Sequence, residues 1–378
     1  MSRVRPRVCF VAHNAFGELA GVDTGHAGGI ERQQAMMARW LSGRDFDVDM
    51  VTWNEGQADG SSHRGVRVLT LCRRDAGLPG LRFVHPRWTS LHSALGRAGA
   101  DVYYYNCGDM GLGQLGLWCR RKRAKLVYSV ASEPDCDPRL PRLRDLRERV
   151  LYRYGLRRAS RVITQTHRQQ RLLREGFGVE SVVLPMPCGF PVEPRDPGSA
   201  PDPGGVARVL WVGRFSAEKR LEWLVDLAVR HPRILFDVVG APNSESPDSR
   251  ALVSRAAGCA NVTLHGRRPL HAVPGFYDRA HVLCCTSSYE GFPNTFLEAW
   301  SRGLPVLTTF DPDDVVRTHG LGWSAQTLDG LSDCLTSLLA DPDGWRARSE
   351  AAVRYYREHH ELDRAMERFV EVLSEVAR

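Results

Sequence analysis

An alternation of short apolar runs with helical patterns constrains the fold more than any other feature of the chain. In the first half, apolar runs typical of buried strands occur at Val8–Ala12, Val48–Thr52, Val66–Leu71, Val102–Tyr105, Leu126–Val130 and Arg161–Thr164. In the second half, they occur at Val206–Val212, Ile234–Val239, Asn261–Leu264, Val282–Thr286 and Pro305–Thr308. Strands that alternate with helices form parallel sheets that helices cover on both faces. The sequence therefore predicts an α/β protein built from doubly wound parallel sheets.

A segment rich in proline and glycine separates the two series of strands. Its composition, over residues 191–205, is typical of a linker, and a chain of 378 residues is long enough for two domains with separate cores. We predict an N-terminal Rossmann-like domain at residues 1–190 and a C-terminal one at residues 206–358. The apolar stripe of the final helix, at residues 359–378, needs a packing partner. We expect this helix to cross back to the N-terminal domain.

The composition is that of a globular protein with anionic partners. Apolar residues make up 43% of the chain and charged residues 25%, and no apolar run is long enough to cross a bilayer. The run Val8–Ala12 is too short for the core of a signal peptide, so we expect a cytoplasmic protein. The ten cysteines form no CxxC pair, and we interpret them as reduced thiols without a structural metal. The net charge of +7 favours nucleotides, anionic lipids or nucleic acid as partners.

A strand–loop–helix unit at residues 281–302 carries the first candidate site. Its loop turns at Gly291 and Pro293, and we predict that Asn294 caps a helix over Thr295–Arg302. The free N–H groups at the start of a helix attract anions, and phosphate groups in particular. This unit is therefore a candidate phosphate site.

Two carboxylates, Glu290 and Glu298, bracket the same turn. Because the loop folds back, both can line one pocket beside the start of the helix. Carboxylates accept hydrogen bonds well from hydroxyl groups, so the arrangement suits a ligand with a central phosphate and hydroxyl groups at either end. The alternative is that Glu290 complements the helix dipole and that Glu298 is a solvated helix residue.

A second candidate site follows the predicted strand at Val206–Val212. The segment Gly213–Arg220 lies at the carboxyl end of this strand, where α/β proteins bind ligands. Arg214 and Lys219 bring two cations to it, and arginine offers a fork for phosphate oxygens while lysine acts as a point charge. The alternative is a pair of solvated charges at the start of a helix.

Together these motifs resemble those of the retaining nucleotide-sugar glycosyltransferases of family 4. The resemblance rests on Gly213-Arg214-Phe215-x-x-Glu218-Lys219 and on Glu290-Gly291-Phe292-Pro293-Asn294-x3-Glu298-Ala299, with its Glu-x7-Glu spacing. Three shorter segments add to it, namely Gly28-Gly29-Ile30-Glu31-Arg32, Val238-Val239-Gly240 and His265-Gly266-Arg267. The resemblance implies the GT-B fold, in which two Rossmann-like domains face an interdomain cleft.

The resemblance also implies a role for each motif. Arg214 and Lys219 would hold the donor diphosphate, with the N–H groups from Gly291 to Asn294 beside it. Glu298 would hold the ribose, and Glu290 would hold the donor sugar. The loop at Gly28-Gly29 would close over the phosphates, or it is an ordinary turn before a helix. The implied catalytic residues are Arg214, Lys219 and Glu290. The implied donor-binding residues are Gly28, Gly29, Gly213, Arg214, Lys219, Gly240, Arg267, Glu290, Gly291, Phe292, Pro293, Asn294 and Glu298.

The implied reaction uses neither a metal nor a cofactor, since the nucleotide-sugar is a substrate. When the bond from the anomeric carbon to phosphate breaks, negative charge grows on the leaving diphosphate, and fixed cations stabilise that charge. Asp-x-Asp patterns at Asp45–Asp47 and Asp135–Asp137 could suggest a metal-dependent transferase. We interpret them as turn or strand-edge clusters.

The acceptor side departs from the family pattern. Many family members carry a histidine after the fourth or fifth strand of the first domain. This chain has Tyr104–Asp109 and Ser129–Pro134 there, without a histidine. The candidate replacements are Asn106, Asp109, Ser132 and Glu133.

Two basic segments leave several partners open. The segment Leu140–Arg158 is amphipathic as a helix, and Arg120–Lys125 is a run of cations. A basic amphipathic helix can lie on an anionic membrane, which would place the protein peripherally on the inner membrane face. The alternatives are a solvated helix surface, or nucleic-acid binding, for which the sequence has no aromatic interleaving and no recognised motif.

The resemblance implies transfer of a hexose from a UDP- or GDP-sugar to an acceptor hydroxyl, with retention at the anomeric carbon. Polysaccharide, glycolipid or other glycoconjugate biosynthesis is the expected setting. Two alternatives come from other classes. The first is a non-catalytic subunit that binds a nucleotide-sugar, and the second is a nucleic-acid-binding protein.

Overall fold

The computed structural model describes residues 5–25, 28–193, 200–201, 206–242 and 246–377. The chain forms two compact units, Met1–Pro187 with Leu362–Arg378, and Cys188–Glu361. Within the predicted linker, residues 194–199 and 202–205 lie outside the described residues. Across the described ranges, no helix is both long enough and apolar enough to cross a membrane.

The first unit is built on an eight-stranded sheet. Its order is β3-β4-β2-β1-β5-β6-β7-β8, and its strand pairs are parallel except β3 with β4. The strands are β1 (Arg7–Val11), β2 (Asp47–Thr52), β3 (Ser62–His63), β4 (Val66–Thr70), β5 (Val102–Tyr105), β6 (Lys125–Ser129), β7 (Arg161–Thr164) and β8 (Val182–Val183). The strand order reverses between β1 and β5. At such a switch point, the carboxyl ends of parallel strands form the ligand site of many α/β proteins.

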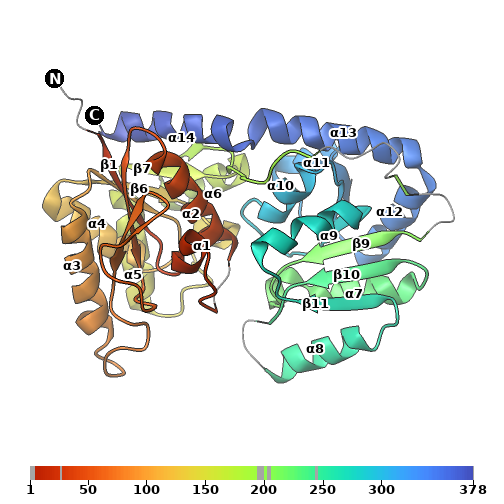
Figure 1. The fold of residues 1–378 in the computed structure, drawn as a ribbon, viewed down its shortest axis with the longest axis horizontal. Coiled ribbons are helices and arrows are strands. Elements are labelled where there is room, and N and C mark those ends of the chain that lie inside the picture. Colours follow the sequence, from red (N-terminus) through yellow and green to blue (C-terminus); the bar gives the residue numbers. More distant parts are fainter. Residues whose placement is uncertain (1–4, 26–27, 194–199, 202–205, 243–245, 378) are drawn as a thin grey trace. The chain divides into compact units, whose positions relative to one another are not determined.

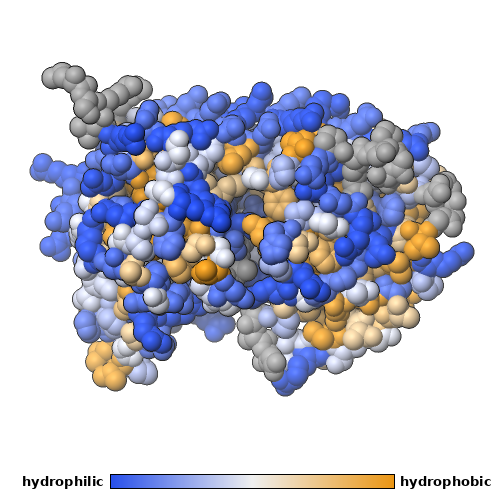
Figure 2. Space-filling view, viewed as in Figure 1, coloured by the Kyte–Doolittle hydropathy of each residue, from blue (hydrophilic) through white to orange (hydrophobic). Residues whose placement is uncertain are grey.

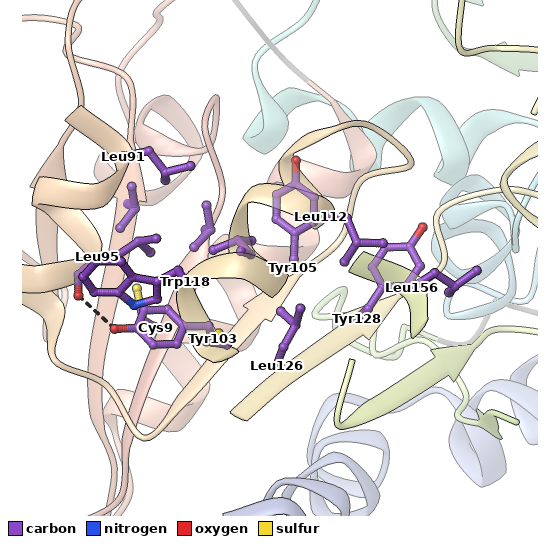
Figure 3. Packing of buried hydrophobic residues seen from close by; sticks show 14 of the residues in the cluster. Cys9, Leu91, Leu95, Tyr103, Tyr105, Leu112, Trp118, Leu126, Tyr128 and Leu156 are labelled. Carbon is purple, nitrogen blue, oxygen red and sulfur yellow. Dashed lines mark hydrogen bonds between the residues drawn. The ribbon is translucent and has the colours of Figure 1, made fainter. Parts of the chain in front are cut away.

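Helices cover both faces of this sheet (Figure 1). One layer contains α3 (Thr89–Ala98), α4 (Gly111–Lys122), α5 (Leu146–Arg158) and α6 (His167–Phe177), and the other contains α1 (Phe16–Ala20), α2 (Gly29–Ser42) and α14 (Leu362–Ala377). Short helical turns, η1 (Phe83–Trp88) and η2 (Glu133–Cys136), lie in the loops. The α3–α6 layer closes over a core that includes Tyr103 and Trp118 (Figure 3). There the hydroxyl of Tyr103 donates to the backbone oxygen of Leu95 at 2.8 Å.

The last helix, α14, packs on the first unit although the chain reaches it from the second. Met366 and Phe369 are buried among side chains of the sheet, and the ring of Phe369 lies 5.4 Å from that of Tyr104. The indole N–H of Trp40 donates to Asp363 at 2.6 Å. Apolar burial and a directional hydrogen bond together fix this helix on the sheet.

The second unit is built on a six-stranded parallel sheet of order β11-β10-β9-β12-β13-β14. The strands are β9 (Arg208–Val212), β10 (Leu235–Val239), β11 (Val262–Gly266), β12 (Val282–Cys285), β13 (Val306–Thr308) and β14 (Gly322–Ser324). The helices α7 (Leu221–Arg230), α8 (Pro247–Ala257) and α12 (Leu328–Ala340) pack on one face. The other helices are α9 (Pro274–Arg279), α10 (Asn294–Trp300), α11 (Val315–Thr318) and α13 (Pro342–His359), with short turns η4 (Ala217–Lys219), η5 (Leu270–Ala272) and η6 (Pro312–Asp314). The strand order reverses between β9 and β12.

The predicted architecture of two doubly wound parallel sheets is confirmed. Every strand predicted from an apolar run is present, with ends that differ by two residues or fewer. The sequence did not reveal β3, β8 and β14. These edge strands have two or three residues that are not fully buried, so they produce no apolar run.

Glycines let α4 and α5 touch backbone to backbone. A methyl group at Gly155 would overlap the backbone carbonyl of Leu112 and lie 2.7 Å from the nitrogen of Gly113. We expect Gly155→Ala to lower the free energy of unfolding by about 1–3 kcal/mol, because the two helices must separate to admit the methyl group. Urea unfolding of the purified protein measures this change.

The matched control is Gly96→Ala in α3. Its methyl group would meet the ring of Trp118 at an ordinary contact distance of 3.6 Å, and alanine favours a helix over glycine. Equal stability of the two variants would contradict the close approach of α4 and α5.

Candidate functional site

Two loops meet at the switch point of the second unit. Because β9 pairs with β12, the loops that follow these strands, residues 213–220 and 286–293, leave the same edge of the sheet. The backbone N–H of Ser288 donates to the backbone oxygen of Glu218 at 2.8 Å. The two candidate sites predicted separately from the sequence are therefore adjacent in the structure.

An ion pair between Lys219 and Glu290 joins the two loops. The same carboxylate oxygen of Glu290 accepts a hydrogen bond from the hydroxyl of Ser287 at 2.7 Å. Burial is the largest influence and lowers the pKa of Lys219, but the charge of Glu290, its hydrogen bond and the nearby Cys285 together outweigh burial and leave that pKa above its usual value. Lys219 is therefore a fixed positive charge at neutral pH.

Arg214 and Arg220 flank this ion pair and make different contacts. Arg214 is half exposed, and its guanidinium lies 3.9 Å from the carboxylate of Glu218. A long, exposed contact of this kind contributes little, so Arg214 can turn toward an anionic ligand at small cost. Arg220 instead holds the loops together, since its side chain donates to the backbone oxygen of Thr286 at 2.6 Å and to the hydroxyl of Thr309 at 2.8 Å. The sequence analysis missed Arg220, because its partners are distant along the chain.

Gly213 and Gly240 approach each other closely at the ends of β9 and β10. Gly240 has a φ of +146°, and a methyl group there would overlap the backbone oxygen of Gly213. The N–H of Gly240 donates to the oxygen of Gly266 at 3.0 Å, at the end of β11. Arg267 follows on the same edge and is exposed. Both glycines therefore have a packing reason that is independent of any ligand.

The helix after β12 begins one residue earlier than predicted. It spans Asn294–Trp300, and its N-cap residue is Pro293. The prediction that Asn294 caps a helix over Thr295–Arg302 is therefore wrong, since Pro293 already takes the extended conformation of a cap. Because proline has no N–H, the predicted row of donors from Gly291 to Asn294 has one member fewer.

Glu298 is buried rather than solvated. It is 3% exposed, and the hydroxyl of Tyr277 in α9 donates to one of its carboxylate oxygens at 2.6 Å. The alternative of a solvated helix residue is therefore wrong. Phe292 is also buried, and its ring lies 4.9 Å from that of His360, so it anchors the loop. The sequence analysis missed Tyr277, which no motif surrounds.

Asn106 and Asp109 lie at the switch point of the first unit, after β5 and beside β1. Asn106 is fully buried. Asp109 accepts a hydrogen bond from the hydroxyl of Tyr105 at 2.6 Å and one from the N–H of Gly111 at 2.7 Å. Asp109 thus holds the start of α4 at the carboxyl edge of the sheet.

Ser132 and Glu133 follow β6, one strand further along the sheet. The N–H and the hydroxyl of Ser132 both lie within hydrogen-bond distance of Asp135, at 3.0 and 3.2 Å. Glu133 pairs with Arg168 at 2.9 Å. Both candidates therefore have partners within the first unit.

A histidine that the sequence analysis missed lies at the same edge. His13 follows β1, and its ring lies 5.0 Å from that of Trp53 and 6.3 Å from that of Tyr105. Burial lowers the pKa of His13, and the nearby Asp109 opposes that effect without cancelling it. The imidazole is therefore neutral at pH 7. The signal that could have found His13 is its position directly after the first apolar run.

Gly28 and Gly29 mark the start of α2. Gly28 is the N-cap residue in an extended conformation, and Gly29 is the first helical residue. A methyl group at Gly28 would overlap the carboxylate of Glu31, so this glycine makes room for a side chain of its own helix. The phosphate-loop role of the two glycines stays a prediction.

Two family models match the chain. "Glycosyl transferase 4-like domain" matches residues 28–189, and "Glycosyl transferases group 1" matches residues 207–341. Among solved structures, sucrose-phosphate synthase from Thermosynechococcus elongatus aligns over 98% of this chain and 99% of its own, with a TM-score of 0.78 and 19% identity. HepE from Anabaena in complex with UDP-glucose aligns over 98% and 99%, with a TM-score of 0.75 and 16% identity. This chain has the GT-B glycosyltransferase fold.

Curated relatives of this GT-B protein match parts of it. The GtfA subunit of UDP-N-acetylglucosamine–peptide N-acetylglucosaminyltransferase from Streptococcus parasanguinis is 28% identical over 164 residues, which are 41% of this chain and 32% of the relative. D-inositol 3-phosphate glycosyltransferase from Nocardiopsis dassonvillei is 27% identical over 220 residues, 51% of this chain and 50% of the relative. The chain thus spans about a third to a half of the length of these relatives.

Asp135 is a buried carboxyl group in the first unit of this GT-B protein. Burial raises the pKa of Asp135 from 3.8 to about 6, although Arg142 and the hydrogen bonds from Ser132 oppose the rise. Asp137, the other member of this Asp-x-Asp pattern, pairs with Arg139 at 2.8 Å. The two aspartates therefore have separate partners.

The raised pKa of Asp135 predicts a pH dependence of stability. Between about pH 4 and pH 6, the folded state binds more protons at Asp135 than the unfolded state does, so stability falls as pH rises across this window. We expect Asp135→Asn to remove a fall of about 3 kcal/mol in the free energy of unfolding. Urea unfolding across the window measures it, with Asp137→Asn as the control that keeps the slope. Parallel profiles for the wild type and Asp135→Asn would refute the assignment.

Proposed function

We propose that this chain is a retaining glycosyltransferase that moves a hexose from a UDP-sugar to an acceptor hydroxyl. The observation that carries the proposal is the grouping of Lys219, Glu290 and Arg214 at the switch point of the second unit. Two cations beside a carboxylate suit a sugar diphosphate, because cations hold phosphate oxygens and a carboxylate accepts hydrogen bonds from sugar hydroxyls. The motifs resemble those of family 4, and this supports retention.

UDP is the proposed donor nucleotide. The GtfA relative carries UDP-N-acetylglucosamine in its name, and the HepE structure contains UDP-glucose. Those statements concern these two proteins, and they favour UDP over the GDP that the sequence motifs also admit. The two named relatives differ in acceptor, one a peptide and the other D-inositol 3-phosphate. For this chain we therefore propose only that the acceptor offers a hydroxyl group and that the reaction belongs to glycoconjugate biosynthesis.

The proposed chemistry is electrostatic stabilisation of the leaving group. The bond between the anomeric carbon and the phosphate oxygen breaks, a bond from the same carbon to the acceptor oxygen forms, and the acceptor proton leaves with the diphosphate. Lys219 and Arg214 face the negative charge that grows on the diphosphate. Fixed cations in a partly desolvated site stabilise this transition state more than the ground state. In this proposal the charge is met by side chains rather than by a metal ion.

Further roles follow from the same geometry. The incoming diphosphate competes for Lys219, which leaves the Glu290 carboxylate to accept hydrogen bonds from the donor sugar. Glu298, held by Tyr277, is the proposed partner of the ribose hydroxyls. On the acceptor side, Asn106, Asp109 and His13 are the proposed residues, since they follow the two strands of the switch point in the first unit.

Thermal-shift measurements with UDP, GDP, ADP and TDP test the donor. A ligand that binds the folded state raises Tm, and we expect the largest rise with UDP.

We expect Glu298→Gln, which keeps the side-chain volume, to weaken UDP binding by about tenfold or more, because a hydrogen bond to a charged acceptor is lost. Glu350→Gln on the exposed side of α13 is the control. Unchanged affinity in Glu298→Gln would argue against the ribose role, and no shift with any nucleotide would refute the donor site.

Arg214→Gln and Lys219→Gln test the leaving-group role. We expect each to lower kcat by about a hundredfold, as loss of a transition-state electrostatic group does. Arg233→Gln, at an exposed arginine before β10, is the matched control. The assay follows release of UDP from UDP-glucose or UDP-N-acetylglucosamine. Near-normal rates in both variants would exclude the mechanism, and UDP binding without turnover by the wild type would favour a non-catalytic subunit.

A further inference from the structure

The outer surface of the α3–α5 layer combines exposed apolar side chains with cations. We propose that this surface, here called the basic apolar face, docks on the anionic headgroups of a lipid membrane. Its apolar part consists of Leu78, Leu81 and Val84, in the loop before α3, and Leu146 and Val150, on α5. Its basic part is formed by the carboxyl ends of α4 and α5. The proposal is independent of the sugar-transfer site, which lies in other elements.

The loop before α3 exposes three aliphatic side chains within seven residues. Leu78 is 71% exposed, Leu81 65% and Val84 57%. Figure 2 shows hydrophobic atoms gathered at the far end of this loop, which Figure 1 places beyond α3. Clustered apolar side chains of this kind, rimmed by charged residues, mark contact sites rather than ordinary surface.

A contact between two elements makes the apolar part continuous. The guanidinium of Arg147 lies 4.1 Å from the ring of Phe83, so the loop and the start of α5 are neighbours. On α5, Leu146 is 74% exposed and Val150, one turn later, is 54% exposed, while Tyr152 and Leu156 are on the buried side. The outer stripe of α5 thus extends the apolar surface of the loop.

The basic part lies where α4 and α5 end. The two helices run side by side in the same direction, with Gly113 against Leu151 and Gly116 against Gly155. Their last turns therefore bring together the cations Arg120, Arg121, Lys122, Arg157 and Arg158. The part of the chain that the structure describes offers no ion pair to any of these five. Unpaired cations at this density attract an anionic surface.

An anionic membrane satisfies both parts at once. Lipid phosphates neutralise the cations, and the boundary between headgroups and acyl chains takes up the leucine and valine side chains. A nucleic acid would neutralise the cations but would leave the exposed leucines in water. The combination therefore favours a lipid surface, with a protein partner as the competing outcome of the test.

Co-sedimentation of the purified full chain with vesicles tests the proposal. The vesicles contain either phosphatidylcholine alone or equal parts phosphatidylcholine and phosphatidylglycerol. We expect binding to the mixed vesicles that falls with salt, and much weaker binding to phosphatidylcholine alone. The triple variant Leu78→Ser, Leu81→Ser, Val84→Ser should lose about tenfold or more in vesicle partitioning. The double variant Arg157→Gln, Arg158→Gln removes two positive charges. It should lower vesicle partitioning by about fivefold for each cation removed.

Matched controls alter exposed aliphatic residues and exposed arginines on the second unit. Val206→Ser with Val229→Ser replaces comparably exposed valines, and Arg354→Gln with Arg357→Gln replaces exposed arginines of α13. The controls should bind vesicles like the wild type. The UDP-induced Tm shift should be unchanged in all variants, which separates this proposal from the donor site.

Absence of binding to the mixed vesicles, or equal losses in the control variants, overturns the proposal. If the face variants instead abolish a complex with another protein while the wild type ignores lipid, the face is a protein-docking surface.

Discussion

The parallel pairing of β9 with β12 is the contact on which the candidate site depends. Lys219 and Glu290 are 71 positions apart in the chain, and they meet because both follow strands that end at one edge of the sheet. Parallel strands bring their carboxyl ends together, so each loop presents its side chains to the other. Arg220 then fixes the spacing through hydrogen bonds to Thr286 and Thr309.

The segments by which the chain enters and leaves the second unit pack against the same site elements. The hydroxyl of Tyr356 donates to the backbone oxygens of Cys188 and Phe190, at 2.9 and 2.8 Å. The ring of Phe190 lies 6.3 Å from that of Tyr277, whose hydroxyl holds Glu298. The position of this buried carboxylate thus depends on residues far outside the strand–loop–helix motif that contains it.

Local patterns explain why so much of the fold could be predicted. A strand buried on both faces is a continuous apolar run, and it can be read without its neighbours. The edge strand β14 lacks such a run, because its residues are half-buried and gain their identity from pairing with β13. The start of α10 was misplaced for a related reason. Asn294 is a good cap by residue type, but the backbone of Pro293 already turns the chain into the helix.

The sequence by itself determined the two doubly wound sheets and the residue types of the candidate site, because apolar periodicity and short motifs are local properties. It also predicted that the cations near Arg214 and the carboxylates near Glu290 suit one ligand. Only the tertiary structure decided which groups touch. It paired Lys219 with Glu290, buried Glu298 under Tyr277, and brought the ring of His13 next to those of Trp53 and Tyr105. Each of these contacts joins different strands or helices, and sheet order, which no local pattern encodes, brings them together.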